Sequence, residues 1–457
     1  MSFMKLFIIL CGAAAMLTGC ATYKTYSRPD VGVDSLYGPE ARVRDTASIA
    51  SLSWTELFSD ALLQSLIREG LANNTDLAVA RLRVEEAEAT LMSSRLAYLP
   101  ALSLAPQGGL SSYGGAKTSK TYTLAATADW EIDLFGKQTN AKRGAQAALE
   151  GSRAYRQAVQ TQLIATIANS YYNLLMLDSQ LDISRRTAAS WAEVLRTYEA
   201  KKKVGEATEA AVAQARANKL SVEASVLTLQ KQIRAQENTL STLLGSVPRH
   251  IDRTTLDEQR FPDEMAVGVP LQLLERRPDV RQAEYALAQA FYATGAARAA
   301  FYPSLRLNGT AGWASNSGAI IANPASWLLS AVASLTQPLF NRGQNIANLR
   351  IAKAQQEEAL LNFRQSLLKA GSEVNDALVQ WQTAGERLEV VGQQIVALQA
   401  AERSALQLME HSTGATYLEV LAARQALLQA ELTEANDKFD RIQGLVNLYH
   451  ALGGGAE

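Results

Sequence analysis

Residues 121–134 read TYTLAATADWEIDL, and this stretch decides the class of fold. Polar and apolar residues alternate along it, so a strand formed here has one apolar face and one polar face. The apolar set is Tyr122, Leu124, Ala126, Ala128, Trp130, Ile132 and Leu134. A weaker alternation over residues 102–110 precedes it, and residues 111–115 supply a turn. The pattern predicts a pair of strands over about residues 101–134.

A second strand pair follows about 200 residues later, over about residues 303–340. Apolar residues alternate with Arg, Asn and Thr over residues 305–313, and residues 327–335 supply a return strand. The sequence DLFGK that starts at Asp133 is answered by PLFNR from Pro338, at a similar offset. A recurrence at this spacing indicates two tandem repeats, each too long to be one unit of a solenoid.

Apolar residues recur at alternating steps of three and four after each strand pair, which predicts long amphipathic helices. The stripes run over residues 163–198, 212–243, 346–409 and 418–449, and Glu402 is a member of the third. A helix over residues 138–203, which contain no proline, would span about 100 Å. The turn residues Gly205 and Gly414 divide the stripes, so we expect one antiparallel helical hairpin in each repeat. Such stripes are also typical of cytoplasmic coiled coils.

The N-terminus has the pattern of an export signal. Residues 1–19 carry Lys5, then a short apolar run, which predicts a secretory signal peptide too short to span a membrane. The following Leu17-Thr18-Gly19-Cys20 resembles a bacterial lipobox, which implies that Cys20 is acylated and becomes the mature N-terminus. An ordinary signal peptide with an incidental cysteine is the alternative. The signal counts against a cytoplasmic coiled coil.

Composition excludes several classes of function. Lys and Arg total 44 against 45 Asp and Glu, and a net charge of -1 argues against a nucleic-acid partner bound by bulk electrostatics. The three histidines are scattered, and no nucleophile, zinc-protease or phosphate-loop motif is present. We therefore expect no enzyme activity, no catalytic residue, no metal site and no cofactor.

The predicted strands have the length and the aromatic placement of membrane-spanning strands. They run to about 10–14 residues, with aromatic residues near their ends. A small soluble sheet packed on the helices would also alternate. Four strands cannot close a membrane barrel, and an open edge in hydrocarbon leaves backbone groups unpaired, so we expect an oligomer. The polar residues Asp129, Glu131, Asp133 and Arg306 would then line a water-filled lumen.

These features together resemble the TolC-like outer-membrane factors, in the lipoprotein branch typified by OprM and the nodulation-T-like proteins. The strongest local matches are LERRPDVRQAE at residues 274–284, AFYP at 300–303 and YLEVL at 417–421. The resemblance covers nearly the whole mature chain. It implies a mainly α fold with a transmembrane β-barrel contribution, in which a homotrimer forms a twelve-stranded barrel on an α-helical periplasmic barrel.

The same resemblance implies a function and a location. We expect the exit duct of a tripartite efflux pump, a passive channel that exports small molecules such as drugs. Its partners would be a periplasmic adaptor, an inner-membrane transporter of the resistance-nodulation-division type, and outer-membrane lipid. It would lie in the outer membrane, lipid-anchored and barrel-inserted, and extend into the periplasm. The alternative is a periplasmic coiled-coil structural or adaptor lipoprotein, which would be a soluble monomer after removal of its lipid.

Family members close the periplasmic end of the duct at the two hairpin turns. The resemblance therefore implies that candidate gate or adaptor contacts lie there, at Gly205, Glu206, Glu209, Gly414, Tyr417, Glu419 and Arg424. The aspartates that the family places a turn beyond its glycines are replaced by Ala211 and Ala422. We therefore expect a gate sealed mainly by packing.

The predicted organisation is as follows. A signal peptide (1–19) and a lipidated, extended N-terminal segment (20–53) precede a first repeat over residues 54–248, with its hairpin at about 138–245. A linker (249–270) leads to the second repeat over residues 271–453, with its hairpin at about 342–453, and a short tail (454–457) follows.

Overall fold

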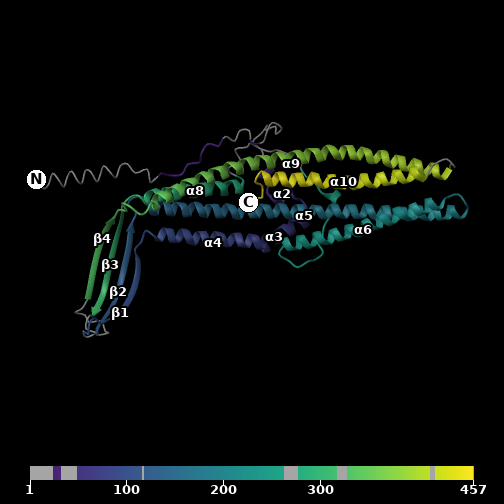
Figure 1. The fold of residues 1–457 in the computed structure, drawn as a ribbon. Helices are drawn as coiled ribbons and strands as arrows, with labels where there is room; N and C mark the ends of the chain where they lie inside the picture. The colour runs from purple at the N-terminus through teal and green to yellow at the C-terminus, as the bar shows by residue number, and fades with distance from the viewer. Residues whose placement is uncertain are drawn as a thin grey trace. The chain divides into compact units, whose positions relative to one another are not determined.

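The structure is a computed structural model of the chain, and it describes residues 24–31, 36, 49–115, 118–261, 276–315, 327–411 and 417–455. Strand pair and helical hairpin follow one another twice along the sequence (Figure 1). The helices are α2 (Trp54–Leu57), α3 (Ala61–Asn73), α4 (Thr75–Leu96), α5 (Lys137–Lys203), α6 (Glu209–Leu243), α8 (Pro278–Ala299), α9 (Gln344–His411) and α10 (Tyr417–Ala451), with short 3-10 turns η2 (Ile49–Ser51) and η3 (Leu256–Glu258). The signal peptide and Cys20 lie outside the described residues.

The chain forms two compact units. One unit comprises Met1–Val31, Leu82–Ala154 and Arg281–Gln365 and contains the sheet. The other comprises Gly32–Arg81, Tyr155–Val280 and Ser366–Glu457 and contains the paired parts of the long helices. No helix within the described residues has both the length and the apolar character needed to cross a membrane.

The sheet has four antiparallel strands in the order β1 (Ala101–Ser111), β2 (Ser119–Ile132), β3 (Ser304–Ser315) and β4 (Trp327–Thr336). Directly paired residues share a face, so the register keeps the two faces chemically distinct: Leu124 lies opposite Trp313 and Glu131 opposite Arg306. The apolar face stays uncovered, and Leu102 and Leu329 are 77% and 68% exposed. Among the described residues, β1 and β4 are the two unpaired edges of the sheet.

β2 ends two residues earlier than the alternation predicts. Asp133 lies beyond the strand and accepts hydrogen bonds from the backbone amides of Gln138 (3.1 Å) and Thr139 (2.8 Å), and from the Thr139 hydroxyl (2.7 Å). A carboxylate in this position satisfies unpaired amides and complements the helix dipole at the start of α5. Asp133 therefore caps α5 and is not part of the strand.

The two repeats use the same joint where the second helix of each hairpin ends. The Asn74 amide donates to the carbonyl of Leu243 (3.0 Å), and the Arg277 guanidinium donates to the carbonyl of Ala451 (2.9 Å). Gly245 follows the first contact with a φ of +67°, and a side chain there would collide with the backbone of Asn73. Gly453 does the same against the backbone of Arg276, with a φ of +84°. Both joints therefore need glycine.

The two joints differ in charge. Asn74 is neutral and caps α4 by accepting from the amide of Leu77 at 3.0 Å. Arg277, whose side chain is 4% exposed, binds Asp279 (2.6 Å) and Glu373 (2.7 Å). Burial opposes ionisation of Asp279, but Arg277 outweighs it and holds the pKa of Asp279 below its usual value. Asp279 thus forms part of a charge cluster around the buried Arg277, in addition to its place in the first turn of α8.

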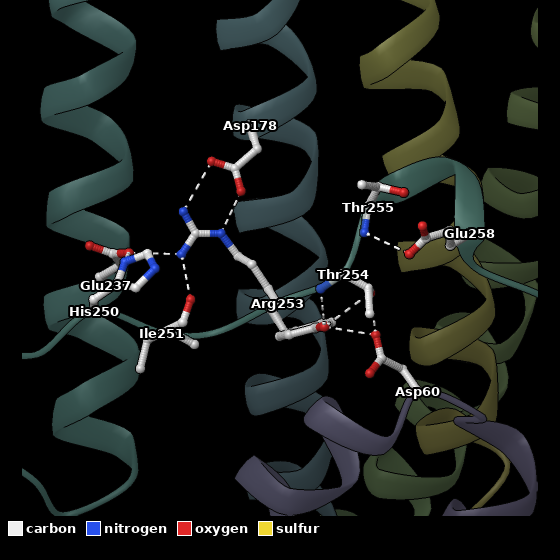
Figure 2. A network of polar contacts seen from close by, with 10 residues as sticks. Asp60, Asp178, Glu237, His250, Ile251, Arg253, Thr254, Thr255 and Glu258 are labelled. Carbon is white, nitrogen blue, oxygen red and sulfur yellow. Dashed lines mark hydrogen bonds and ion pairs between the residues drawn. The ribbon is translucent and has the colours of Figure 1, made fainter.

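The predicted linker is fastened to the helices over its described part, residues 249–261. Arg253 binds both oxygens of Asp178 on α5, and it donates to Glu237 on α6 (2.7 Å) and to the carbonyl of Ile251 (2.8 Å). Figure 2 shows this guanidinium between the two carboxylates. On the other side, Asp60 accepts from the hydroxyls of Tyr171 (2.7 Å) and Thr254 (2.5 Å). We call the residues Asp178, Glu237, His250 and Arg253 the Arg253 cluster.

Candidate functional site

The polar face of the sheet carries a row of charged side chains at one end. Arg306 pairs with Glu131 at 3.1 Å across β2 and β3, and Lys137 pairs with the same carboxylate at 2.7 Å. An open cavity of about 650 Å³ lies beside them. Its lining comes from the end of α4 and the residues after it, from β2 and β3, and from the start of α5, and includes Leu96, Pro100, Asp129, Glu131, Gln138, Arg306 and Asn308.

The first hairpin turn is closed by backbone geometry and one cap. Gly205 adopts a φ of +80°, in the left-handed region that glycine enters without strain. The Thr208 hydroxyl accepts from the amide of Ala211 (3.2 Å) and so caps α6. Glu209 pairs with Lys202 across the turn, which holds the pKa of Glu209 below its usual value. Glu206 is exposed.

The second hairpin turn is only partly described. Gly414 and the side chain of Tyr417 lie outside the described residues. Glu419, in the first turn of α10, is exposed.

Arg424, on α10, joins three helices. Its side chain is 12% exposed and pairs with Glu402 on α9 at 2.9 Å. It also donates to the hydroxyl (2.6 Å) and the carbonyl (3.2 Å) of Ser190 on α5. The guanidinium lies 5.9 Å from the ring centre of Trp191, which is fully buried. We call Ser190, Trp191, Glu402 and Arg424 the Arg424 cluster.

Apolar packing surrounds this cluster. One hydrophobic core combines residues of α5, α6 and α10, and its buried members are Ile183, Trp191, Val194, Tyr198, Ala211, Val212, Ala215, Val222, Leu421, Leu428 and Ala435. Ala211 therefore belongs to the core, where an aspartate would be buried. Ala422 is exposed.

Sequence reasoning identified Arg424 but missed its partners. Glu402 gave a signal, because a carboxylate within an apolar heptad stripe is out of place unless a cation meets it. Ser190 gave none, since a serine on a helix has no periodicity of its own. Among the described residues, no cluster of histidine, cysteine, aspartate and glutamate could hold a metal ion.

A strand pair followed by a long helical hairpin, with both parts duplicated, is the architecture that the sequence predicts for an outer-membrane channel. Comparison with known proteins agrees with this class. The family described as outer membrane efflux protein matches residues 66–246 and 269–454, and the chain belongs to this family.

Relatives of this chain span almost its full length. It is 29% identical over 447 residues to the cation efflux system protein CusC of Escherichia coli K12, covering 97% of this chain and 98% of that protein. It is 30% identical to the toluene efflux pump outer membrane protein TtgC of Pseudomonas putida, covering 99% and 96%. A structure of the Neisseria gonorrhoeae MtrE outer membrane channel in its open state matches with a TM-score of 0.86 and 29% identity, covering 95% of this chain and 98% of that one.

The predicted fold class and function are confirmed by these matches. The protein is the outer-membrane channel of an efflux pump, built as a trimeric β-barrel on an α-helical barrel that extends into the periplasm. Its partners are an adaptor and an inner-membrane transporter. The alternative, a periplasmic coiled-coil structural or adaptor lipoprotein, is therefore not needed to explain the helices.

Proposed function

We propose that this chain is a passive, lipid-anchored exit duct for small molecules such as drugs, serving a transporter of the resistance-nodulation-division type. The main support for a duct is the sheet, which has one apolar face and one polar face. Its uncovered apolar face suits lipid, and its polar face, with Asp129, Glu131 and Arg306, suits a water-filled lumen. Acylation of Cys20 supplies the anchor. The duct itself performs no catalysis and needs no cofactor.

Three copies complete the barrel wall. The free edges β1 and β4 pair with the neighbouring copies, so that twelve strands close and no backbone group is left unpaired in hydrocarbon. Native mass spectrometry of protein extracted from outer membranes tests this arrangement directly. A trimer carrying acyl mass at Cys20 is expected, and an acylated monomer would contradict it.

We further propose that the Arg424 cluster is a latch within a gate sealed mainly by packing. The latch fastens α10 and α9 to α5 through one cation, while the apolar core around Trp191 and Ala211 excludes water. The turns at Gly205 and Gly414, with Glu206, Glu209, Tyr417 and Glu419, form the surface that meets the adaptor.

Conductance in planar lipid bilayers tests the latch. The wild-type trimer is expected to rest in a low-conductance state, and Arg424→Ala is expected to raise the frequency of open events. Glu206→Ala, on the exposed first turn, is the matched control and leaves conductance unchanged. If Arg424→Ala opened the pore as fully as deletion of the whole turn, packing would not be the main seal.

A further inference from the structure

The described part of the N-terminal segment, residues 24–31, is bound along one side of α8. Arg28 makes two hydrogen bonds of 2.8 Å to the two oxygens of Glu284, a bidentate ion pair. The backbone amide of Tyr26 donates to the hydroxyl of Tyr292 at 3.2 Å. The Tyr26 ring meets Phe291 edge to face, with ring centres 5.9 Å apart. All of these residues belong to the unit that contains the sheet.

The helix that binds this segment, α8, itself packs on α5. Gly144 and Gly151 of α5 lie against Tyr292 and Tyr285 of α8, where an added Cβ would stand 3.7 Å and 3.5 Å from the tyrosine Cβ atoms. Arg143 of α5 also lies over the ring of Tyr292, at 6.0 Å from its centre. The binding surface for Tyr26 and Arg28 therefore lies on a helix that packs closely on α5.

The contacts fix the direction of the segment. From Arg28 back to Tyr26 the partner on α8 advances from Glu284 to Tyr292, about 12 Å along the helix axis. This is the direction of Ala299, where α8 ends just before β3 begins at Ser304. Preceding residues that continue this course therefore move toward the base of the sheet.

Chain length limits where the lipid anchor can lie. Six residue steps separate Cys20 from Tyr26, and a fully extended chain covers about 20 Å in that number of steps. If the chain were held only from Leu36, which lies against Gly371, sixteen steps would separate the held residue from Cys20 and allow a reach of about 55 Å. The contacts on α8 thus shorten the tether by more than half.

We propose that Tyr26 and Arg28 form a clasp on α8 that holds the acylated N-terminus beside the membrane end of that helix. The partner of the acylated N-terminus is a lipid surface. The acyl chains enter it at the level where the strands begin. The clasp thereby sets anchor and sheet in register with the same membrane. This inference rests on the lipid anchor of the proposed function.

Limited trypsin digestion of the lipidated trimer in nanodiscs tests the clasp. Cleavage after Lys24 is followed by mass, as the product that begins at Thr25; trypsin does not cut between Arg28 and Pro29. Because a protease needs a locally open chain, the double variant Tyr26→Ala, Glu284→Gln should be cut about tenfold faster than wild type. An equal rate in the double variant and in wild type would overturn the clasp.

Two matched controls accompany this experiment. Tyr26→Phe should keep the wild-type rate, because the Tyr26 hydroxyl has no hydrogen-bond partner among the described residues. Glu88→Gln breaks an exposed ion pair with Arg153 in the same unit and should also leave the rate unchanged.

Crosslinking tests the direction. Acylation of Cys20 and removal of Cys11 leave no other thiol, so cysteines introduced at Thr22 and Arg298 can be joined by a short bis-maleimide. The crosslink should form in the wild-type background, lose most of its yield in the double variant, and be absent between Thr22→Cys and Gln282→Cys. A dominant crosslink to position 282 would overturn the proposed course.

Acyl mass at Cys20 separates the two proposals. An acylated trimer whose Lys24 is cut as fast as in the double variant would overturn the clasp alone. A wild-type chain without acyl mass would defeat the lipid anchor, and with it the membrane role of the clasp, even if Lys24 were protected.

Discussion

Arg253 and Arg424 each join helices within the same unit, but they do so at different strength. Arg253 is 9% exposed, and its N–H groups donate to two carboxylates and a backbone carbonyl. Arg424 is 12% exposed and meets one carboxylate, the hydroxyl and the carbonyl of Ser190, and the ring of Trp191. The first arrangement is a joint in which one cation holds two carboxylates on two helices. The second has fewer charges to separate, which suits the proposed latch.

The largest effect is expected from removing Arg253. Arg253→Ala removes the cation that links Asp178 to Glu237, whose side chain is 3% exposed, and leaves Glu237 with only His250 and the exposed Arg234 as basic neighbours. Removing the main partner of a buried carboxylate costs about 3–5 kcal/mol. The trimer of this variant should dissociate at a markedly lower temperature. Samples heated to a series of temperatures and run on a gel show this as the loss of the trimer band. Arg249→Ala is the control, because its pair with Glu69 is exposed and is worth about 0–1 kcal/mol. If Arg253→Ala and Arg249→Ala lowered the dissociation temperature equally, Arg253 would stabilise the fold no more than an exposed ion pair does.

The next effect concerns the acid side of the same joint. Burial opposes ionisation of Glu237, but hydrogen bonds from Arg253 and His250 outweigh it and hold the pKa of Glu237 below its usual value. A depressed folded-state pKa gives stability that is complete above the unfolded-state pKa, about 4.3, and is lost as pH falls through the folded-state value.

The contribution of Glu237 to stability should therefore be flat from about pH 7 to pH 5 and fall below about pH 4. Glu237→Gln keeps one acceptor but loses the charge, so it should cost about 1–3 kcal/mol at pH 7 and flatten the fall at low pH. Thermal unfolding of wild type and variant across this range measures both. A variant that loses stability with acid as steeply as wild type would show that Glu237 does not carry the pH dependence.

Arg424→Ala should affect stability less and gating more. Arg424 pairs with one carboxylate where Arg253 pairs with two, so we expect a smaller loss, about 1 kcal/mol, within the range of ordinary hydrogen bonds. Conductance should nevertheless rise, since the latch between α10 and α5 is gone. Paired measurements of melting temperature and single-channel conductance on Arg424→Ala and Arg253→Ala sharpen the comparison. A large stability loss for Arg424→Ala without a change in conductance would make it a second joint.

The sequence predicted the repeating parts of this molecule and missed the single contacts. Alternation over residues 121–134 and the heptad stripes are repeated many times, so they predict strands and helices before any tertiary contact is known. The alternation continues two residues past the end of β2 at Ile132, because Asp133 fits the alternation and equally well caps α5.

Residues that make a single specific contact do not recur along the sequence, so no periodic pattern reveals them. Arg253 lies in a segment read as a linker, and nothing local indicates that Asp178, 75 positions earlier, is its partner. Glu402 was visible as a charge in an apolar stripe, but its partner Arg424 comes from the next helix. Long-range ion pairs of this kind depend on how two hairpins are brought together, and that is a property of the folded chain.

The smallest effect is expected from Ser190→Ala, and it separates the two halves of the latch. The substitution removes the hydroxyl that accepts from Arg424 at 2.6 Å, but the Ser190 carbonyl at 3.2 Å and Glu402 at 2.9 Å remain. A loss of about 0.5–1 kcal/mol is therefore expected, with a smaller rise in conductance than Arg424→Ala produces. In the double variant Ser190→Ala, Arg424→Ala the two effects should not add, because both remove the same contact. Additive effects in that cycle would mean that Arg424 acts on the pore through Glu402 and that α5 is not held by the latch.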